Sequence, residues 1–96
     1  MSDDQIDVVN NSAENRYEAT VNGEVGFAEY ELTGERIIFP HTVVPEAIEG
    51  RGVASEIARF ALEDARSRKL SVVPRCAFFI DYIEKHPEYG DLVAAE

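Results

Sequence analysis

The stretch Glu49-Gly50-Arg51-Gly52-Val53-Ala54-Ser55 decides how this sequence is interpreted. It follows an apolar run that stops at Pro45, and it opens an amphipathic segment that reaches about Arg68. Two glycines at this spacing allow a tight turn, and the unpaired N–H groups at a helix start attract an anion. The residues alone leave two readings open: a phosphate-binding loop, or a glycine-rich helix start that binds no ligand.

The segment after the predicted helix carries a more specific signal. A short strand runs into the only cysteine as Ser71-Val72-Val73-Pro74-Arg75-Cys76, and His86-Pro87-Glu88-Tyr89 follows. Phosphate loop, crossover helix, strand and terminal thiol together resemble the GNAT superfamily of N-acetyltransferases, and more narrowly its very small, single-cysteine branch. The resemblance covers roughly residues 16 to 93. Within it, Gly52 and Ala54 match the pyrophosphate motif of the superfamily.

One position departs from that motif. Glu49 stands where the superfamily usually has Arg or Gln. A carboxylate repels a diphosphate, so this residue is expected to weaken phosphate binding.

The resemblance implies an α+β fold with a mixed, mainly antiparallel sheet, one crossover helix and a short C-terminal helix. It implies acetyl-CoA as cosubstrate, held by residues 49 to 55, and transfer of acetyl to an amine. The N-terminal helices that usually cover the acceptor side have no counterpart here, so a lysine or basic peptide would have access. A non-catalytic coenzyme A-binding module and a protein-interaction domain remain as alternatives.

Cys76 is the best candidate for a nucleophile. It lies at a strand end just before a helix start, where the helix dipole and nearby cations favour a thiolate. A thiolate can accept an acetyl group by thioester exchange and pass it to an amine. A buried structural cysteine is the alternative. In the branch that the sequence resembles, the proposed nucleophile lies at this place.

Two further residues are candidates for proton transfer. Tyr82 would lie where the superfamily has a tyrosine that protonates the departing thiolate, and a core aromatic is the alternative. His41 is a candidate base, since imidazole is neutral at pH 7, and a hydrogen-bonded strand histidine is the alternative. The branch often has Glu two residues after this histidine, whereas here Val43 occupies that position. His86 is predicted to cap a helix.

The first half of the chain predicts strands joined by tight turns. A short strand is expected near residues 5–9, and the alternation of apolar and polar residues predicts another strand around residues 17–21. Asn22-Gly23 is typical of a type I′ hairpin turn. In the next strand Val25 and Phe27 are out of phase with the later apolar residues, which predicts a bulge near Ala28.

The third strand is predicted over residues 36–44 and contains Pro40. A proline cannot donate to the sheet ladder, so Pro40 is expected to mark a bulge or an unpaired position. In the GNAT superfamily the corresponding strand separates from its neighbour and admits the pantetheine arm of coenzyme A, and Pro40 is suitably placed to enforce this. An ordinary edge-strand proline is the alternative.

Helical periodicity begins at Val53 and continues for about four turns, and residues 71–74 form the next short strand. A strand–helix–strand unit of this length makes the two strands parallel. Residues 78–85 predict a final short helix, which Pro87 terminates.

Composition bounds the function. The 96 residues, 45% of them apolar, predict one domain over residues 1–96, with residues 1–15 partly flexible. The chain has no stretch of about 20 apolar residues and its N-terminus does not resemble a signal peptide, so a cytoplasmic protein without membrane contact is expected. One cysteine also fits a reducing compartment.

The charge pattern bounds the partners. The formal net charge is −10, with nine basic residues scattered among nineteen acidic ones. Such a field disfavours nucleic acid and favours a cationic partner such as an amine or basic peptide, although acidity that serves only solubility is the alternative. One cysteine and two distant histidines do not predict a metal site.

Overall fold

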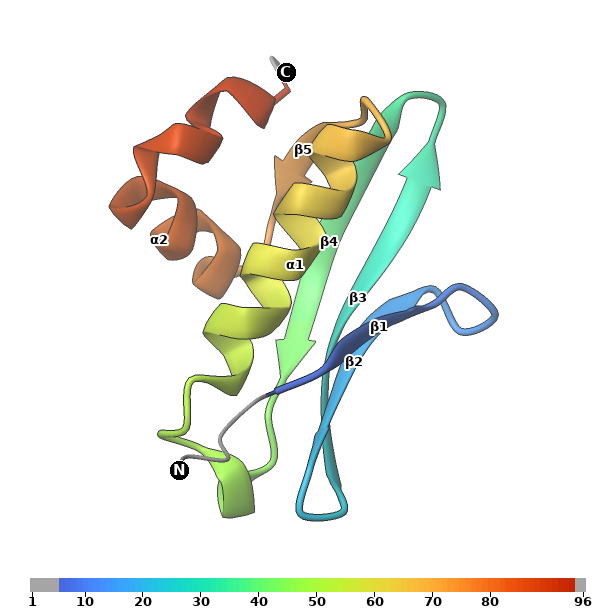
Figure 1. Ribbon diagram of the computed structural model, residues 1–96. Helices are drawn as coiled ribbons and strands as arrows, with labels where there is room; N and C mark the ends of the chain where they lie inside the picture. Colours follow the sequence, from blue (N-terminus) through green and yellow to red (C-terminus); the bar gives the residue numbers. More distant parts are fainter. Residues whose placement is uncertain (1–5, 95–96) are drawn as a thin grey trace.

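The computed structural model describes residues 6–94 and shows a twisted sheet with helices packed on one face (Figure 1). The strands are β1 (Val8–Asn11), β2 (Arg16–Val21), β3 (Glu24–Thr33), β4 (Arg36–Val43) and β5 (Ser71–Pro74). The α-helices are α1 (Val53–Ser67) and α2 (Ala77–Lys85), and two 3₁₀ segments are η1 (Glu46–Ile48) and η2 (Pro87–Leu92).

The sheet has the order β1-β2-β3-β4-β5. The first four strands are antiparallel neighbours, whereas β5 pairs with β4 in parallel after the crossover through α1. The predicted α+β fold, with its mixed, mainly antiparallel sheet, is confirmed. No helix of the described part of the chain is long and apolar enough to cross a membrane.

The turn between β2 and β3 has the predicted conformation. Asn22 and Gly23 both have positive φ, at 51° and 81°, which a type I′ turn requires. Val21 pairs with Glu24 directly across it. The short strand predicted near residues 5–9 lies slightly later, as β1, and residue 5 is outside the described residues.

The bulge predicted near Ala28 is wrong. β3 pairs with β2 without a shift from Glu24 to Glu29, and its buried face carries Gly26, Ala28 and Tyr30. The reason is steric, because α1 packs closely against this part of the sheet. A Cβ on Gly26 would lie 3.2 Å from Val53 Cγ1, so the small residues Gly26 and Ala28 occupy the face near α1 while Val25 and Phe27 point outward.

The irregularity lies in β4 instead. Glu29 pairs with His41 and Glu31 with Ile38, so Phe39 and Pro40 together oppose the single residue Tyr30. This is a bulge on β4, and it confirms the irregularity that Pro40 predicts. The extra residue moves every later side chain of β4 to the face opposite the one that regular alternation would give it.

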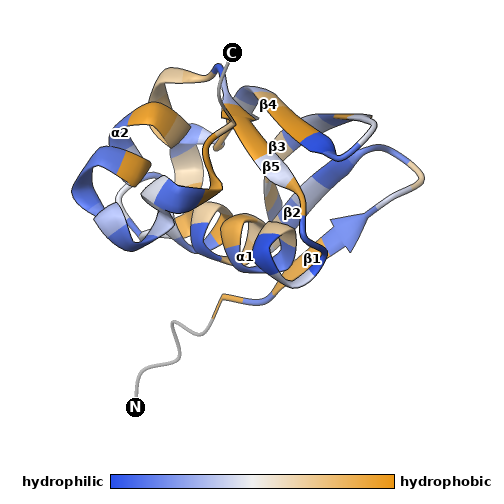
Figure 2. Cartoon of the chain, turned by 90° about the horizontal axis from the view of Figure 1, so that it is seen from above, coloured by the Kyte–Doolittle hydropathy of each residue, from blue (hydrophilic) through white to orange (hydrophobic). Residues whose placement is uncertain are grey.

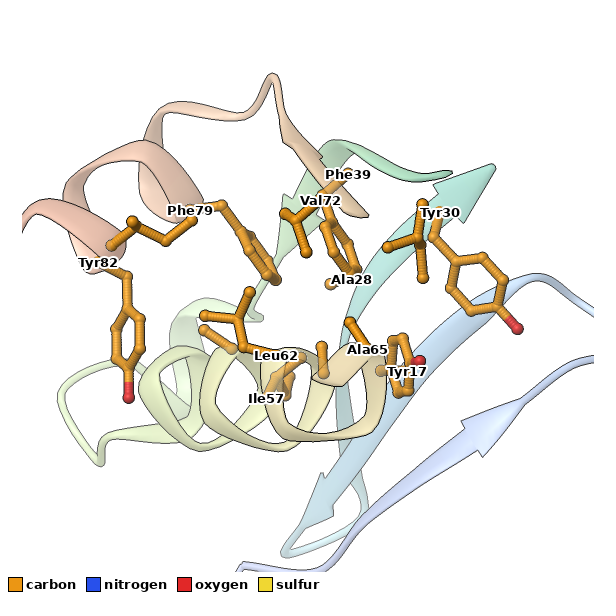
Figure 3. Packing of buried hydrophobic residues seen from close by; sticks show 14 of the residues in the cluster. Tyr17, Ala28, Tyr30, Phe39, Ile57, Leu62, Ala65, Val72, Phe79 and Tyr82 are labelled. Carbon is orange, nitrogen blue, oxygen red and sulfur yellow. The ribbon is translucent and has the colours of Figure 1, made fainter. Parts of the chain in front are cut away.

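The core lies between the sheet and the helices, as Figure 3 shows. Hydrophilic and hydrophobic residues are both found along α1 (Figure 2), and its buried residues are the apolar ones. Phe39 of β4 stacks on Phe79 of α2, with ring centroids 4.3 Å apart. All six apolar α1 residues that define the predicted stripe are buried: Val53, Ile57, Ala58, Ala61, Leu62 and Ala65.

The C-terminal segment is fastened to α1. The η2 segment follows Pro87, and the guanidinium of Arg66 donates two 3.0 Å hydrogen bonds to the Asp91 carboxylate. Val93 then adds a parallel bridge to Val72 on the outer edge of β5. Buried Tyr89 and Leu92 add to this attachment, and the Tyr89 hydroxyl donates a 2.7 Å hydrogen bond to the Glu63 carboxylate of α1.

Candidate active site

A cleft opens where β4 and β5 part. The two strands pair from Arg36 and Ser71 to Phe39 and Pro74, after which β4 continues to Val43 while the other chain turns into α2. The opening has a volume of about 720 Å³. Its lining comes from the second half of β4, the segment before α1 and the start of α2: Pro40, His41, Thr42, Val43, Val44, Glu49, Ala54, Arg75, Cys76, Ala77 and Phe78.

The carbonyl of Phe39 closes the inner end of this cleft. It accepts hydrogen bonds from the N–H groups of Arg75, at 3.1 Å, and Cys76, at 2.9 Å. Both bonds converge on the bulge residue next to Pro40, which has no N–H of its own. Cys76 is thereby held at the point where the strands separate.

Cys76 is the N-cap residue of α2 and is half-buried. Its side chain does not cap the helix, and instead Sγ lies 3.1 Å from the Oγ1 atom of Thr42 on β4. The thiol therefore points into the cleft from the positive end of the α2 dipole. This is the strand-end, helix-start position that the sequence predicts.

The bulge on β4 decides which of its polar side chains faces Cys76. Thr42 pairs with Ala28, which is fully buried on the helix side, whereas His41 pairs with Glu29 on the open side. Without the extra residue at Phe39–Pro40 the two would exchange faces. The structure brings Thr42 to the sulfur, and leaves His41 exposed at the rim of the same cleft.

The glycine-rich loop leads into α1. Gly50 and Gly52 have φ of 82° and 78°, and a Cβ at either would meet no atom within 4 Å. The first main-chain hydrogen bond of the helix runs from the Glu56 N–H to the Gly52 carbonyl, at 3.0 Å. The N–H groups of the residues before Glu56 therefore precede the first hydrogen bond of the helix.

The predicted loop residues divide between two hollows. Glu49 and Ala54 line the cleft with Cys76, whereas Arg51, Gly52 and Ser55 line a second hollow of about 670 Å³ beside the start of β1. The Val53 side chain is 2% exposed and belongs to the core.

Tyr82 is on α2 but does not line this cleft. Its ring stacks on His86, with centroids 4.0 Å apart. In Figure 3 its ring extends alongside α1, apart from Phe79 and Phe39. Burial raises the pKa of Tyr82 above its ordinary value. His86 caps α2 as predicted, because its Nδ1 atom lies 2.9 Å from the Tyr82 carbonyl oxygen.

Thr42 and Phe78 also line the cleft, and no role was predicted for either of them. Plain alternation from the buried Ile37 and Phe39 would place His41 on the helix side instead of Thr42, so the sequence pattern holds no signal for this residue. In the described part of the chain no group of three or more His, Cys, Asp and Glu side chains is arranged to hold a metal ion.

A family model described as GCN5-related N-acetyltransferase matches residues 16–92. The chain belongs to this family. Members of the GCN5-related N-acetyltransferase family use acetyl-CoA as their cosubstrate and have an acceptor as second substrate.

Curated relatives and a solved structure agree with this assignment. The chain is similar to Protein NATD1 of chicken (Gallus gallus), at 36% identity over 59 residues that cover 60% of this chain and 54% of that protein. Protein NATD1 of Homo sapiens is also 36% identical over 59 residues, which are 52% of its length. The match therefore spans about half of each relative.

The fold itself has a solved counterpart. An NMR structure of a GCN5-like putative N-acetyltransferase from Staphylococcus aureus superposes with a TM-score of 0.70 at 24% identity. The superposition covers 100% of this chain and 93% of that one. It shows that the present chain has the GNAT fold.

Proposed function

We propose that this chain binds acetyl-CoA in the cleft between β4 and β5 and transfers the acetyl group to an amine by way of Cys76. One observation carries the proposal: the Cys76 sulfur points into the same cleft that the loop residues Glu49 and Ala54 line. Two residues of the candidate phosphate loop therefore share one opening with the candidate nucleophile, whereas Arg51, Gly52 and Ser55 line the second hollow.

The loop residues fit a diphosphate. The space where a Cβ would project from Gly50 and Gly52 is open, so the backbone can be approached closely. The N–H groups of Val53, Ala54 and Ser55 precede the first helical bond, and the α1 dipole adds positive potential there. Glu49 opposes binding, since its carboxylate lines the same cleft.

Acetyl-CoA supplies an acetyl group already activated as a thioester. In the proposed reaction the Cys76 sulfur forms a bond to the acetyl carbonyl carbon, and the bond from that carbon to the coenzyme A sulfur breaks. Coenzyme A leaves as the thiol, with the proton that Cys76 has lost. The acceptor amine then attacks the cysteine thioester, and the Cys76 thiol is regenerated with a proton from that amine.

His41 is placed to accept a proton from the incoming amine, since it lies exposed at the rim of the cleft. A neutral imidazole can do so at pH 7. The proton-donor role of Tyr82 stays a prediction, because Tyr82 does not line the cleft.

The acceptor we propose is an amine on a cationic molecule, such as a lysine in a basic peptide. Glu29 and Glu31 lie on the face of the sheet that α1 does not cover, and Glu29 pairs with His41 across β3 and β4. Glu18 on the same face is paired with Arg16 at 2.6 Å and adds little to this attraction. Together with the net charge of −10, this face attracts positive charge toward the rim of the cleft.

The test is self-acetylation. The protein is incubated with acetyl-CoA without an acceptor, and the intact mass is measured before and after hydroxylamine. We expect one hydroxylamine-labile acetyl group on wild type and none on Cys76→Ala. Cys76→Ala is expected to retain coenzyme A binding, which a thermal-shift titration measures. A ligand at about 100 times its Kd adds about 2.7 kcal/mol to the unfolding free energy.

Other outcomes favour the alternatives. A Cys76→Ala variant that transfers acetyl at the wild-type rate would mean that the amine attacks acetyl-CoA directly. Binding without acetylation of the protein or of any amine would indicate a non-catalytic coenzyme A-binding module, which the carboxylate of Glu49 in the cleft favours. Absence of binding would leave a protein-interaction domain.

A further inference from the structure

We infer that Thr42 is a positioning residue for Cys76: its hydroxyl donates a hydrogen bond to the thiolate and directs the sulfur into the cleft. The inference rests on the proposed function and deepens it, because it assigns the group that makes this cysteine reactive. The observation that carries it is the 3.1 Å contact between Thr42 Oγ1 and Cys76 Sγ, 34 residues apart in the chain.

The direction of the hydrogen bond follows from the chemistry of the two groups. A neutral thiol can donate or accept, so either atom can be the donor while Cys76 is protonated. A thiolate has no proton to donate, and the threonine hydroxyl must then be the donor. Hydrogen bonds to charged groups are stronger than those between neutral groups, so the contact favours the thiolate over the thiol.

The backbone holds both partners in place. The Cys76 N–H bonds to the Phe39 carbonyl at 2.9 Å, which fixes the start of α2 against the bulge of β4. The same bulge turns Thr42 to the helix side, where it pairs with the buried Ala28. Threonine is β-branched, so its side chain has few rotamers on a strand, and the hydroxyl loses little freedom in the contact.

Three other titratable or charged side chains line the same cleft. They are His41 from β4, Glu49 from the segment before α1 and Arg75 beside Cys76 itself. Substitutions at Thr42 change none of these three residues, and comparison of a valine with a serine variant separates the effect of the hydroxyl from that of the methyl group.

The experiment measures the rate of Cys76 alkylation by iodoacetamide against pH, for wild type, Thr42→Val and Thr42→Ser. Valine keeps the branched shape without the hydroxyl, and serine keeps the hydroxyl without the methyl group. We expect Thr42→Val to move the midpoint of the profile up by about one pH unit, which lowers the rate below the midpoint roughly threefold, because there is less thiolate but each thiolate is more nucleophilic. Thr42→Ser is expected to stay near the wild-type profile.

The shape of the profile separates positioning from simple access. Loss of the donor would lower the rate below the midpoint and raise it above the midpoint, whereas a changed opening would alter the rate in the same direction at every pH. Thr20→Val serves as the matched control, because Thr20 is an exposed threonine of β2. A Thr42→Val profile that coincides with wild type, or a Thr42→Ser profile that coincides with Thr42→Val, would overturn the inference.

Alkylation requires no acetyl-CoA, so the outcome is independent of the proposed reaction. A midpoint that depends on Thr42 in a protein that never self-acetylates would support the contact and refute the acetyl transfer. Self-acetylation with a profile indifferent to Thr42 would support the transfer and refute the contact. Circular dichroism of each variant confirms that the fold is retained.

Discussion

The Tyr17 hydroxyl donates a 2.6 Å hydrogen bond to the Asp64 carboxylate and so fastens β2 to the last turns of α1. Tyr17 is fully buried, and Asp64 also pairs with Arg68 at 3.2 Å on the solvent side. The bond therefore joins two elements that lie 47 residues apart.

Tyr17→Phe is expected to lower the unfolding free energy by about 1–2 kcal/mol, since the hydrogen bond has a charged acceptor but Asp64 keeps its arginine. Urea unfolding measures the change. The matched control is Tyr30→Phe, whose hydroxyl bonds to the neutral Asn10 side chain at 2.7 Å. A loss for Tyr17→Phe no larger than for Tyr30→Phe would contradict the importance of the charged partner.

Alkaline pH should destabilise the protein. Burial, with the neighbouring Asp64, raises the pKa of Tyr17 above its ordinary value, and burial with Glu63 raises the pKa of Tyr89 to about 12. Between pH 10 and 12 the unfolded chain loses these protons while the folded chain keeps them, so unfolding becomes easier. We expect Tm to be insensitive to these two groups below pH 10 and to fall above it, and Tyr17→Phe to fall less steeply. Equal slopes for both proteins would assign the loss to other groups.

Gly26 governs how closely α1 approaches the sheet. Gly26→Ala would place a Cβ 3.2 Å from Val53 Cγ1 and 3.4 Å from the Val43 carbonyl, so the start of α1 must move. We expect a loss of about 1–3 kcal/mol in unfolding free energy and weaker binding of acetyl-CoA. Gly90→Ala is the control, because no atom lies within 4 Å of the added Cβ. Similar stability of the two variants would contradict the close approach.

Glu49→Gln is expected to tighten coenzyme A binding about fivefold at low salt, because it removes about 1 kcal/mol of repulsion from the diphosphate. Isothermal titration measures the affinity. Glu46→Gln removes the same charge from the nearby η1 segment, outside the residues that line the cleft, and should change affinity less. Raising the salt concentration should shrink the difference. Identical affinities for wild type and Glu49→Gln would take the carboxylate out of the binding site.

Tyr82→Phe tests the role that family resemblance assigns to this tyrosine. A proton donor acts mainly in the transition state, so the donor role predicts a large fall in turnover with little change in acetyl-CoA binding. Steady-state kinetics and titration on one sample give both quantities. Unchanged turnover would leave Tyr82 as a packing residue that stacks on His86, consistent with its place outside the cleft.

The helices and most turns could be predicted from the sequence because their signals are local. The stripe from Val53 to Ala65 has the helical period, and Asn22-Gly23 is a residue pair that favours the type I′ turn of a two-residue hairpin. Cys76 was predicted at a helix start, and it is the N-cap of α2. Each of these depends on a few neighbouring residues.

The inward face of β3 could not be predicted in this way. Counting apolar residues favours Val25 and Phe27 as core, yet Gly26 and Ala28 face α1 because a helix packs there at short distance. The contact between Thr42 and Cys76 is equally non-local, because it depends on a bulge whose extra residue only the pairing with β3 reveals. Family resemblance pointed to Cys76 as the candidate nucleophile, whereas its contact with Thr42 is visible only in the three-dimensional structure.

The proline in β4 has a consequence for kinetics. Because Pro40 has no N–H and Phe39 gives its carbonyl to both Arg75 and Cys76, the strands are already parted when the chain has folded. A pantetheine arm would then find a preorganised channel and need not break sheet hydrogen bonds to enter. Association would be limited by diffusion and by the field of an acidic surface rather than by a conformational change.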